Sequence, residues 1–154
     1  MQNEYVKMIY EKYSKSLYKI SIIMLRNEQD ARDAVQDTFE KYIYSKRCFD
    51  DDEHEKAWLI RVNINICRNY MRFHKMHPTV DYETLSVCTH SNEQNEIMDV
   101  LLKLKPKYKE PLILYYIEGY SCKEVAEILN ISESAAKKRL ERARKRLKEE
   151  YGDV

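Results

Sequence analysis

The sequence predicts an all-α protein made of two small helical domains joined by a flexible linker. First, its 154 residues include only two glycines and three prolines, whereas sheet-rich folds use many of these residues in their turns. Second, apolar residues recur every three or four positions along most of the chain, which is the period of an amphipathic helix. Third, basic, acidic and basic segments follow one another and divide the chain into two helical groups with a connection between them.

The first domain is predicted to span residues 1–76. Its apolar residues place three helices at about 8–25, 28–45 and 55–73. Asn27 fits a break between the first two helices, and a polar loop with three consecutive aspartates occupies 48–55. The third helix has an apolar stripe and a polar, basic opposite face, so we expect one face in the core and the other in solvent.

Residues 77–92 are predicted to form an acidic linker. This stretch lacks helical periodicity and contains Pro78 with several serines and threonines. No lysine or arginine stands between Pro78 and Asp99, whereas the preceding segment Arg61–His77 contains no acid. The pattern indicates two nucleic-acid contacts joined by a connection that avoids nucleic acid. Solvated helix faces would explain either basic segment alone, but they explain the whole pattern less well.

The second domain is predicted to span residues 93–154 and to begin with two helices, at about 93–105 and 108–118. Gly119 fits the C-cap of the second of these helices, because glycine readily adopts a left-handed conformation. Pro111 has no backbone N–H and costs the helix one hydrogen bond if it lies in the interior. The start of this helix is therefore left open.

Residues 121–147 are predicted to form a helix-turn-helix. Ser121 and Glu124 have the spacing of a capping box at the start of a short helix. Asn130 can adopt the left-handed conformation that a tight turn requires, and Ser132 can cap the long helix that follows. In such a motif the second helix enters the major groove of DNA with its N-terminal end.

The second helix of this motif is strongly basic. A helical hairpin with a charged solvent face would share that property, but the agreement of turn, caps and basic helix favours DNA binding. The side chains expected to reach base edges and phosphates are Ser134, Lys137, Lys138 and Arg142. The side chains expected to extend the basic surface are Arg139, Arg144, Lys145 and Arg146.

Four segments carry a resemblance to the extracytoplasmic-function (ECF) sigma factors of the sigma-70 family. Their C-terminal DNA-binding domain resembles GYSCKEVAEILNISESAAKKRLERARKRL, and the helix before it resembles LKPKYKEPLILYYIEGYS. Two signature helices of their N-terminal domain resemble DARDAVQDTFEKYI and EKAWLIRVNINICRNYMR. The helix-turn-helix alone occurs in several regulator families, but two different domains in this order make the resemblance specific.

The resemblance implies an RNA polymerase sigma factor, which binds core polymerase, directs it to specific promoters and helps to melt promoter DNA. It implies polymerase binding by Asp33, Gln36, Asp37 and Glu40. It implies contacts to the minus-ten promoter element by the loop 48–53 and by Trp58, Arg61, Asn65, Arg68, Asn69 and Arg72. It implies contacts to the minus-thirty-five element by Ser134, Ala135, Lys137, Lys138, Arg139 and Arg142. From the residues alone, Trp58 fits core packing better than base stacking.

The implied partners are core RNA polymerase, promoter DNA and an anti-sigma factor, since some members of the family are controlled by one. Three positions depart from the family pattern: Asn69 replaces a common acid, Ile64 a common basic residue and Ala136 a usual β-branched residue. An autonomous helix-turn-helix regulator with a sensory first domain is the alternative, and it would bind DNA as a dimer without polymerase.

No enzyme, cofactor or metal site is expected. The four cysteines have no CxxC spacing, the four histidines match no zincin motif, and the chain has neither a phosphate-binding glycine loop nor a nucleophile elbow. Residues 1–10 show no signal-peptide core, and no apolar run approaches membrane-spanning length. We therefore expect a cytoplasmic protein without membrane insertion.

Overall fold

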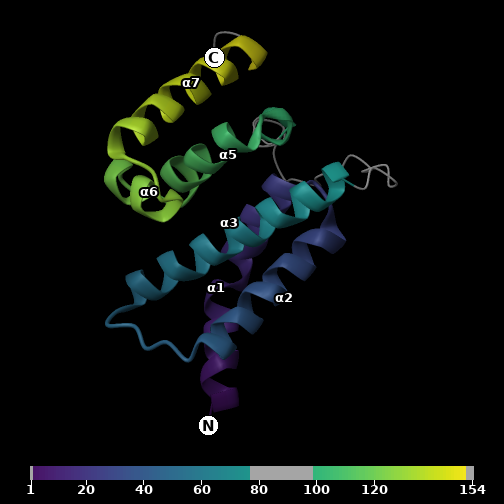
Figure 1. Cartoon of the computed structure of the whole chain (residues 1–154), viewed down its shortest axis with the longest axis vertical. Helices are drawn as coiled ribbons and strands as arrows, with labels where there is room; N and C mark the ends of the chain where they lie inside the picture. The colour runs from purple at the N-terminus through teal and green to yellow at the C-terminus, as the bar shows by residue number, and fades with distance from the viewer. Residues whose placement is uncertain (1, 77–98, 152–154) are drawn as a thin grey trace. The chain divides into compact units, whose positions relative to one another are not determined.

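The computed structural model describes residues 2–76 and 99–151, and every regular element in these ranges is a helix (Figure 1). The predicted all-α fold is thereby confirmed. Contacts divide the chain into two compact units, Met1–Leu85 and Ser86–Val154. The predicted linker at 77–92 and the start of the helix predicted at 93–105 lie outside the described residues, so the predicted domain boundaries stay a prediction.

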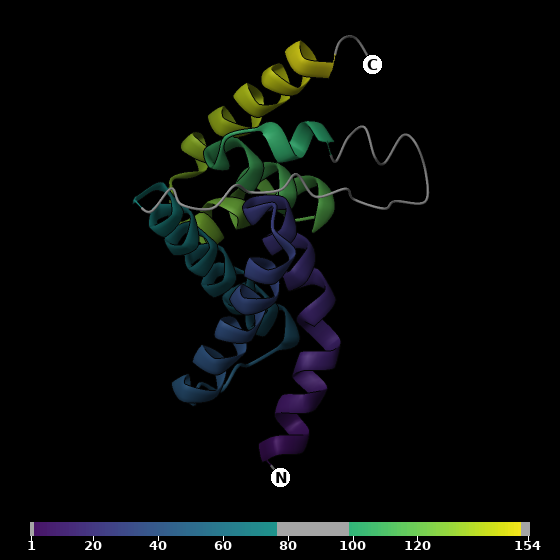
Figure 2. The same cartoon turned by 90° about the vertical axis from the view of Figure 1, so that its right-hand side faces the viewer.

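The first unit consists of three long helices that pack against one another. They are α1 (Gln2–Leu25), α2 (Glu28–Ser45) and α3 (Asp52–Met76), and both views show them side by side (Figure 1 and Figure 2). Their core is apolar at most positions, and its most deeply buried large side chains are Ile9, Leu17, Ile20, Ile23, Leu59, Ile60 and Ile64. Ile64, one of the three departures from the family pattern, lies in this core.

The connections of the first unit follow from local backbone chemistry. α1 ends at Leu25, and the next residue, Arg26, has a left-handed φ of 58°. The Asn27 side chain accepts a hydrogen bond of 2.9 Å from the Asp30 N–H at the start of α2. The predicted break at Asn27 is therefore confirmed. The loop 46–51 is shorter than predicted, because Asp51 accepts a hydrogen bond of 2.7 Å from the His54 N–H and α3 begins at Asp52.

A buried polar network crosses the core of the first unit. The Ser21 hydroxyl of α1 donates to Asn63 Oδ1 of α3 over 3.0 Å, and the Asn63 amide donates to Thr38 Oγ1 of α2 over 3.1 Å. The Thr38 hydroxyl in turn donates to the carbonyl of Ala34 over 2.7 Å. All three polar side chains are fully buried, so their mutual bonds replace water and fix how the helices lie against one another.

The second unit contains a helical segment at 99–103 and four further elements. These are α5 (Pro106–Leu112), the π-helix η1 (Ile113–Ile117), α6 (Cys122–Leu129) and α7 (Glu133–Tyr151). α7 packs against both α5 and α6. The contact faces are apolar and often small, with Leu114, Val125, Ala126, Ala136, Leu140 and Ala143 buried.

The predicted helix at 108–118 divides into α5 and η1. Pro106 lies at its start, where a missing N–H costs nothing, but Pro111 lies in the interior and lacks the N–H for an α-helical bond. The helix widens after this point, and the Glu118 N–H donates to the Ile113 carbonyl over 3.0 Å. Gly119 follows with a φ of +79°, which confirms the left-handed position predicted there.

The helix-turn-helix has the predicted local structure. Ser121 Oγ accepts from the Glu124 N–H over 3.2 Å, and Glu124 accepts from the Ser121 N–H over 3.0 Å, which completes the capping box. Asn130 is left-handed with a φ of 56°, and Ser132 accepts a bond of 3.1 Å from the Ala135 N–H at the start of α7. These caps fix where each helix begins and ends.

Candidate polymerase and DNA interfaces

The four side chains predicted to bind polymerase all come from α2. Gln36 and Glu40 are exposed, whereas Asp33 and Asp37 are half-buried. Asp33 accepts a hydrogen bond of 3.0 Å from Gln29 one turn earlier. In the described part of the chain Gln36 and Glu40 form no hydrogen bond or ion pair, so both can serve a partner.

Asp37 already has a strong partner within the first unit. The Tyr70 hydroxyl of α3 donates to Asp37 Oδ2 over 2.6 Å. The pKa of Tyr70 is raised above its ordinary value, mainly by burial and secondly by the hydrogen bond to Asp37. The phenol therefore stays protonated and remains a donor. Asp37 therefore ties α2 to α3, a role that the sequence did not predict.

A shallow hollow of about 550 Å³ lies between α2 and α3. Two residues of the predicted polymerase set, Asp37 and Glu40, line it together with Asn69 of the predicted minus-ten set. Its other lining residues are Lys41, Tyr44, Ile66, Tyr70 and Phe73. The two predicted surfaces therefore adjoin, although the sequence analysis treated them as separate faces. Phe73, an apolar residue at the end of the helix predicted at 55–73, is 57% exposed at this hollow.

The basic face of α3 is displayed as predicted. Arg61, Asn65, Asn69 and Arg72 are exposed, and their spacing places them along one side of the helix. Arg68 is half-buried and donates to Asn65 Oδ1 over 3.3 Å. A helix face that carries arginines and amides without any acid can neutralise phosphates and bind base edges.

An aromatic and basic cluster that the sequence did not predict forms where the loop 46–51 meets α2 and α3. The Trp58 ring lies 5.7 Å from the Phe49 ring and 6.0 Å from the Tyr42 ring, with Arg47 6.0 Å from its centre. Trp58 and Phe49 are half-buried, so their rings pack against each other and still reach the surface. Asp52 and Glu53 belong to α3, so residues 48–51 of the predicted contact 48–53 lie in the loop and the other two lie in the helix.

The N-terminal half of α7 presents a free basic surface. Ser134, Lys137, Lys138 and Arg142 are exposed, while Ala135 and Arg139 are half-buried. Lys137 lies 3.6 Å from Glu133 in an exposed ion pair, which is weak enough to exchange for a phosphate. Ala136, which departs from the family pattern, is fully buried, as are Leu140 and Ala143 of the same helix.

The C-terminal half of α7 uses its arginines differently. Arg144 donates from Nε to the Tyr116 hydroxyl over 2.5 Å, and its guanidinium lies 5.5 Å from the Tyr115 and Tyr116 ring centres. Arg146 lies 5.9 Å from the Tyr108 ring centre. These contacts bind α7 to α5 and η1. Arg144, Lys145 and Arg146 are exposed like the basic residues of the N-terminal half, but Arg144 and Arg146 also contact tyrosines of η1 and α5.

Neither the metal-ligating side chains nor the thiols form a further site in the described residues. No group of three or more His, Cys, Asp or Glu side chains gathers within 2–76 and 99–151. Cys48, Cys67 and Cys122 form no disulfide in these ranges. In the same ranges no helix has the length and apolar character needed to cross a membrane.

Together the two units define a sigma-type transcription initiation factor. One unit presents an acidic helix, an aromatic loop and a basic helix face, and the other presents a helix-turn-helix. The family profile described as "Sigma-70 region 2" matches residues 9–76, and that described as "Sigma-70, region 4" matches residues 94–147.

Relatives identify the family. The chain is 32% identical over 152 residues to the ECF RNA polymerase sigma factor SigM of Bacillus subtilis (strain 168), covering 93% of each protein. It is 27% identical over 165 residues to the ECF RNA polymerase sigma factor SigW of the same organism, covering 95% of this chain and 88% of SigW. The chain therefore belongs to the ECF sigma factors of RNA polymerase, and the family expected from its motifs is confirmed.

A solved structure agrees with this identification. The chain matches the sigma factor RpoE, crystallised with the anti-sigma factor NepR from Bartonella quintana, with a TM-score of 0.81 and 25% identity. The match covers 96% of this chain and 98% of RpoE. The function predicted from the sequence, that of an RNA polymerase sigma factor, is thereby confirmed, and an autonomous regulator is not favoured.

Proposed function

We propose that three surfaces of this sigma factor divide the work of transcription initiation. α2 binds core polymerase through Gln36 and Glu40, with Asp33 and Asp37 at the edge of the contact. The loop 46–51 and the basic face of α3 bind and melt the minus-ten element. The N-terminal half of α7 binds the minus-thirty-five element.

The presence of two separate basic helix surfaces on one chain is the observation that best supports this proposal. The acid-free face of α3 and the exposed half of α7 each suit DNA, whereas the acidic face of α2 does not. A protein that binds two promoter elements and repels DNA with a third surface has that third surface available for a protein partner.

Melting requires no bond chemistry, because a protein that binds open DNA better than the duplex shifts the equilibrium. Unpairing and unstacking a base costs a few kcal/mol. Stacking a flipped base on an aromatic side chain returns about 1–3 kcal/mol. Trp58 and Phe49 offer such rings beside Arg47, which can hold the neighbouring phosphate. The protein therefore needs no catalytic residue, and we assign it no enzymatic activity.

An anti-sigma factor completes the proposed partners. RpoE was solved with the anti-sigma factor NepR, and CnrH, which is 26% identical to this chain with a TM-score of 0.73, with the cytosolic domain of CnrY. These complexes support control of this chain by a similar partner. Because the proposed activity takes place on polymerase and promoter DNA, we also propose that the protein acts in the bacterial cytoplasm.

The test of polymerase binding is to mix the purified protein with core RNA polymerase and follow both on a sizing column, with the protein alone as the reference. We expect co-elution in a one-to-one complex. The charge reversal Glu40→Arg should weaken the complex, whereas Glu11→Arg, at an exposed acid of α1, should not. Tight DNA binding by the protein alone, without co-elution with active core, would contradict the proposal.

A further inference from the structure

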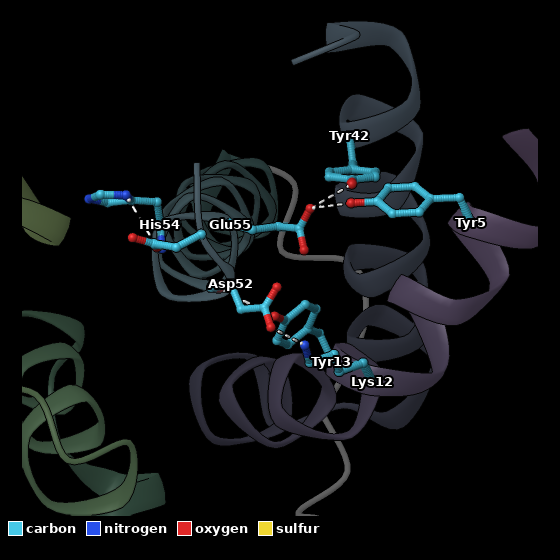
Figure 3. Close-up of polar contacts among 8 residues, drawn as sticks. Tyr5, Lys12, Tyr13, Tyr42, Asp52, His54 and Glu55 are labelled. Atoms are coloured by element: carbon cyan, nitrogen blue, oxygen red, sulfur yellow. Dashed lines mark hydrogen bonds and ion pairs between the residues drawn. The ribbon is translucent and has the colours of Figure 1, made fainter. Parts of the chain in front are cut away.

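The first turn of α3 is held by side chains from both other helices of the first unit (Figure 3). Glu55, which is only 3% exposed, accepts a hydrogen bond of 2.8 Å from the Tyr42 hydroxyl of α2. The same carboxylate oxygen accepts one of 3.2 Å from the Tyr5 hydroxyl of α1. Glu55 was expected at the end of the polar loop 48–55, with no role of its own.

The Glu55 carboxylate is stabilised by hydrogen-bond donors instead of a positive side chain. In the described residues it forms no ion pair, and a buried carboxylate without compensation is costly. Its place in the first turn of α3 offers the positive end of the helix dipole. Burial, and next the bond to Glu55, raise the pKa of Tyr42 above its ordinary value, so Tyr42 remains the donor.

A second pair of contacts holds the same turn from α1. Lys12 forms an ion pair of 2.8 Å with Asp52, the first residue of α3, and the Tyr13 hydroxyl donates to the Asp52 carbonyl over 3.3 Å. Figure 3 shows Tyr5 and Tyr42 approaching Glu55 on one side of the turn and Lys12 and Tyr13 gathered at Asp52. Contacts from α1 therefore fix the point where the loop 46–51 joins α3.

Tyr42 links this anchor to the loop itself. Its ring lies parallel to the Phe49 ring, with an interplanar angle of 7° and 6.3 Å between centres, and meets Trp58 edge-on at 6.0 Å. The hydroxyl bond to Glu55 limits rotation of the Tyr42 ring, on which Phe49 stacks. A change at Tyr5 or Glu55 should therefore alter the place of the loop aromatics, although neither residue lies in the loop.

We propose that Tyr5, Tyr42 and Glu55 are positioning residues for promoter melting, which hold Phe49 and Trp58 in the arrangement that receives an unpaired base. The proposal deepens the function proposed above for the loop 46–51 and rests on it for its DNA part. It extends the melting apparatus to the N-terminal turns of α1, to which no DNA contact was assigned above.

The first experiment uses the free protein and its single tryptophan, Trp58, as a reporter of the loop. Tyr42→Phe keeps the stacked ring and removes only the hydroxyl, so we expect acrylamide to quench Trp58 more readily. Tyr5→Phe should do the same to a smaller extent. Two controls should leave quenching unchanged: Tyr18→Phe, which removes another hydroxyl from α1, and Ser21→Ala, which lowers stability by breaking the buried network.

The second experiment measures holoenzymes made with these variants for promoter binding and for permanganate reactivity of unpaired thymines. Tyr42→Phe should reduce opening about tenfold with little change in polymerase binding, because it removes a hydrogen bond to a charged group. Glu55→Ala should have the same effect. Glu55→Gln should restore much of the opening, since its amide oxygen still accepts both bonds.

The outcomes separate this proposal from its alternatives. If Tyr42→Phe lowers thermal stability as Ser21→Ala does but changes neither quenching nor opening, the contact serves folding alone and the proposal is wrong. A loss of opening without any change at Trp58 would also overturn it. If no wild-type holoenzyme forms, the function proposed for the chain fails, yet increased quenching in free Tyr42→Phe would still support positioning of the loop.

Discussion

The two units maintain their folds by different means. In the helix-turn-helix segment 121–147 of the second unit the buried side chains are apolar, although α5 of the same unit buries the charged Lys109 and Glu110. Each helix boundary of the motif is fixed by a cap from within a few residues, as at Ser121 and Asn130. In the three-helix unit the helices are joined by buried polar bonds between residues far apart in sequence, such as Ser21 and Asn63. The first arrangement depends on local sequence, and the second depends on tertiary structure.

The largest effect is expected from a cavity in the apolar core of the helix-turn-helix. Leu140 of α7 is 1% exposed, and Leu140→Ala should lower the free energy of unfolding of that unit by about 2–5 kcal/mol. A domain this small has little stability to lose, so binding to a minus-thirty-five DNA fragment should largely disappear. Trp58 reports only on the first unit, so its urea transition should stay in place.

The control is Glu149→Ala, at an exposed site on the same helix, which should change neither DNA binding nor the Trp58 urea transition. A shift of the Trp58 transition in Leu140→Ala would show that the two units unfold together. The conclusion that each unit maintains its own fold would then be wrong.

The corresponding change in the first unit is Asn63→Ala. It removes the acceptor of the Ser21 hydroxyl and a donor to Thr38, and leaving such buried groups without partners should cost about 1–3 kcal/mol. The Trp58 urea transition should therefore move to lower denaturant, while DNA binding by the second unit remains. Asn65→Ala, at an exposed site on the same helix, should leave the transition unchanged.

This contrast also explains what the sequence could predict. Ser121, Glu124 and Asn130 make their capping bonds to backbone groups within four residues, so their residue types and spacing were sufficient. The partners of Glu55 and Asn63 lie up to 50 and 42 residues away, and no local pattern identifies such pairs.

The candidate interfaces follow the same rule. Helical period alone placed the exposed arginines and amides of α3 and the exposed half of α7. Period could not show that Asp37 is bonded to Tyr70 or that Arg144 packs on Tyr115 and Tyr116, because these facts depend on which helices meet. Pro111 left the start of its helix open, and the sequence did not predict the π-helical turn that follows this residue.

The two halves of α7 sharpen this comparison between local and long-range contacts. Arg144 is hydrogen-bonded to a tyrosine 28 residues away in the sequence, in a unit whose helix boundaries are fixed by local caps. Arg142→Gln should weaken DNA binding by about 1–3 kcal/mol, or reduce the slope of its salt dependence by about one if Arg142 binds a phosphate. Arg144→Gln should instead lower the melting temperature and leave the salt slope unchanged. Equal salt slopes for the two variants, both below that of the wild type, would place Arg144 in the DNA contact and contradict this division.

The smallest effect concerns the capping box and its dependence on pH. Hydrogen bonds from the Ser121 backbone, and next from its side chain, lower the pKa of Glu124 from its ordinary value of 4.5. Because the folded protein binds this proton less tightly than the unfolded chain, Glu124 contributes its stability above the unfolded pKa. That contribution is lost as the pH falls from about 4.5 through the folded pKa. The side chain is exposed, so solvent screening keeps the effect small.

Glu124→Gln should therefore lower the melting temperature of the second unit slightly at neutral pH and match the wild type in acid. A difference that persists unchanged in acid would mean that the charge of Glu124 is not the source of the stabilisation.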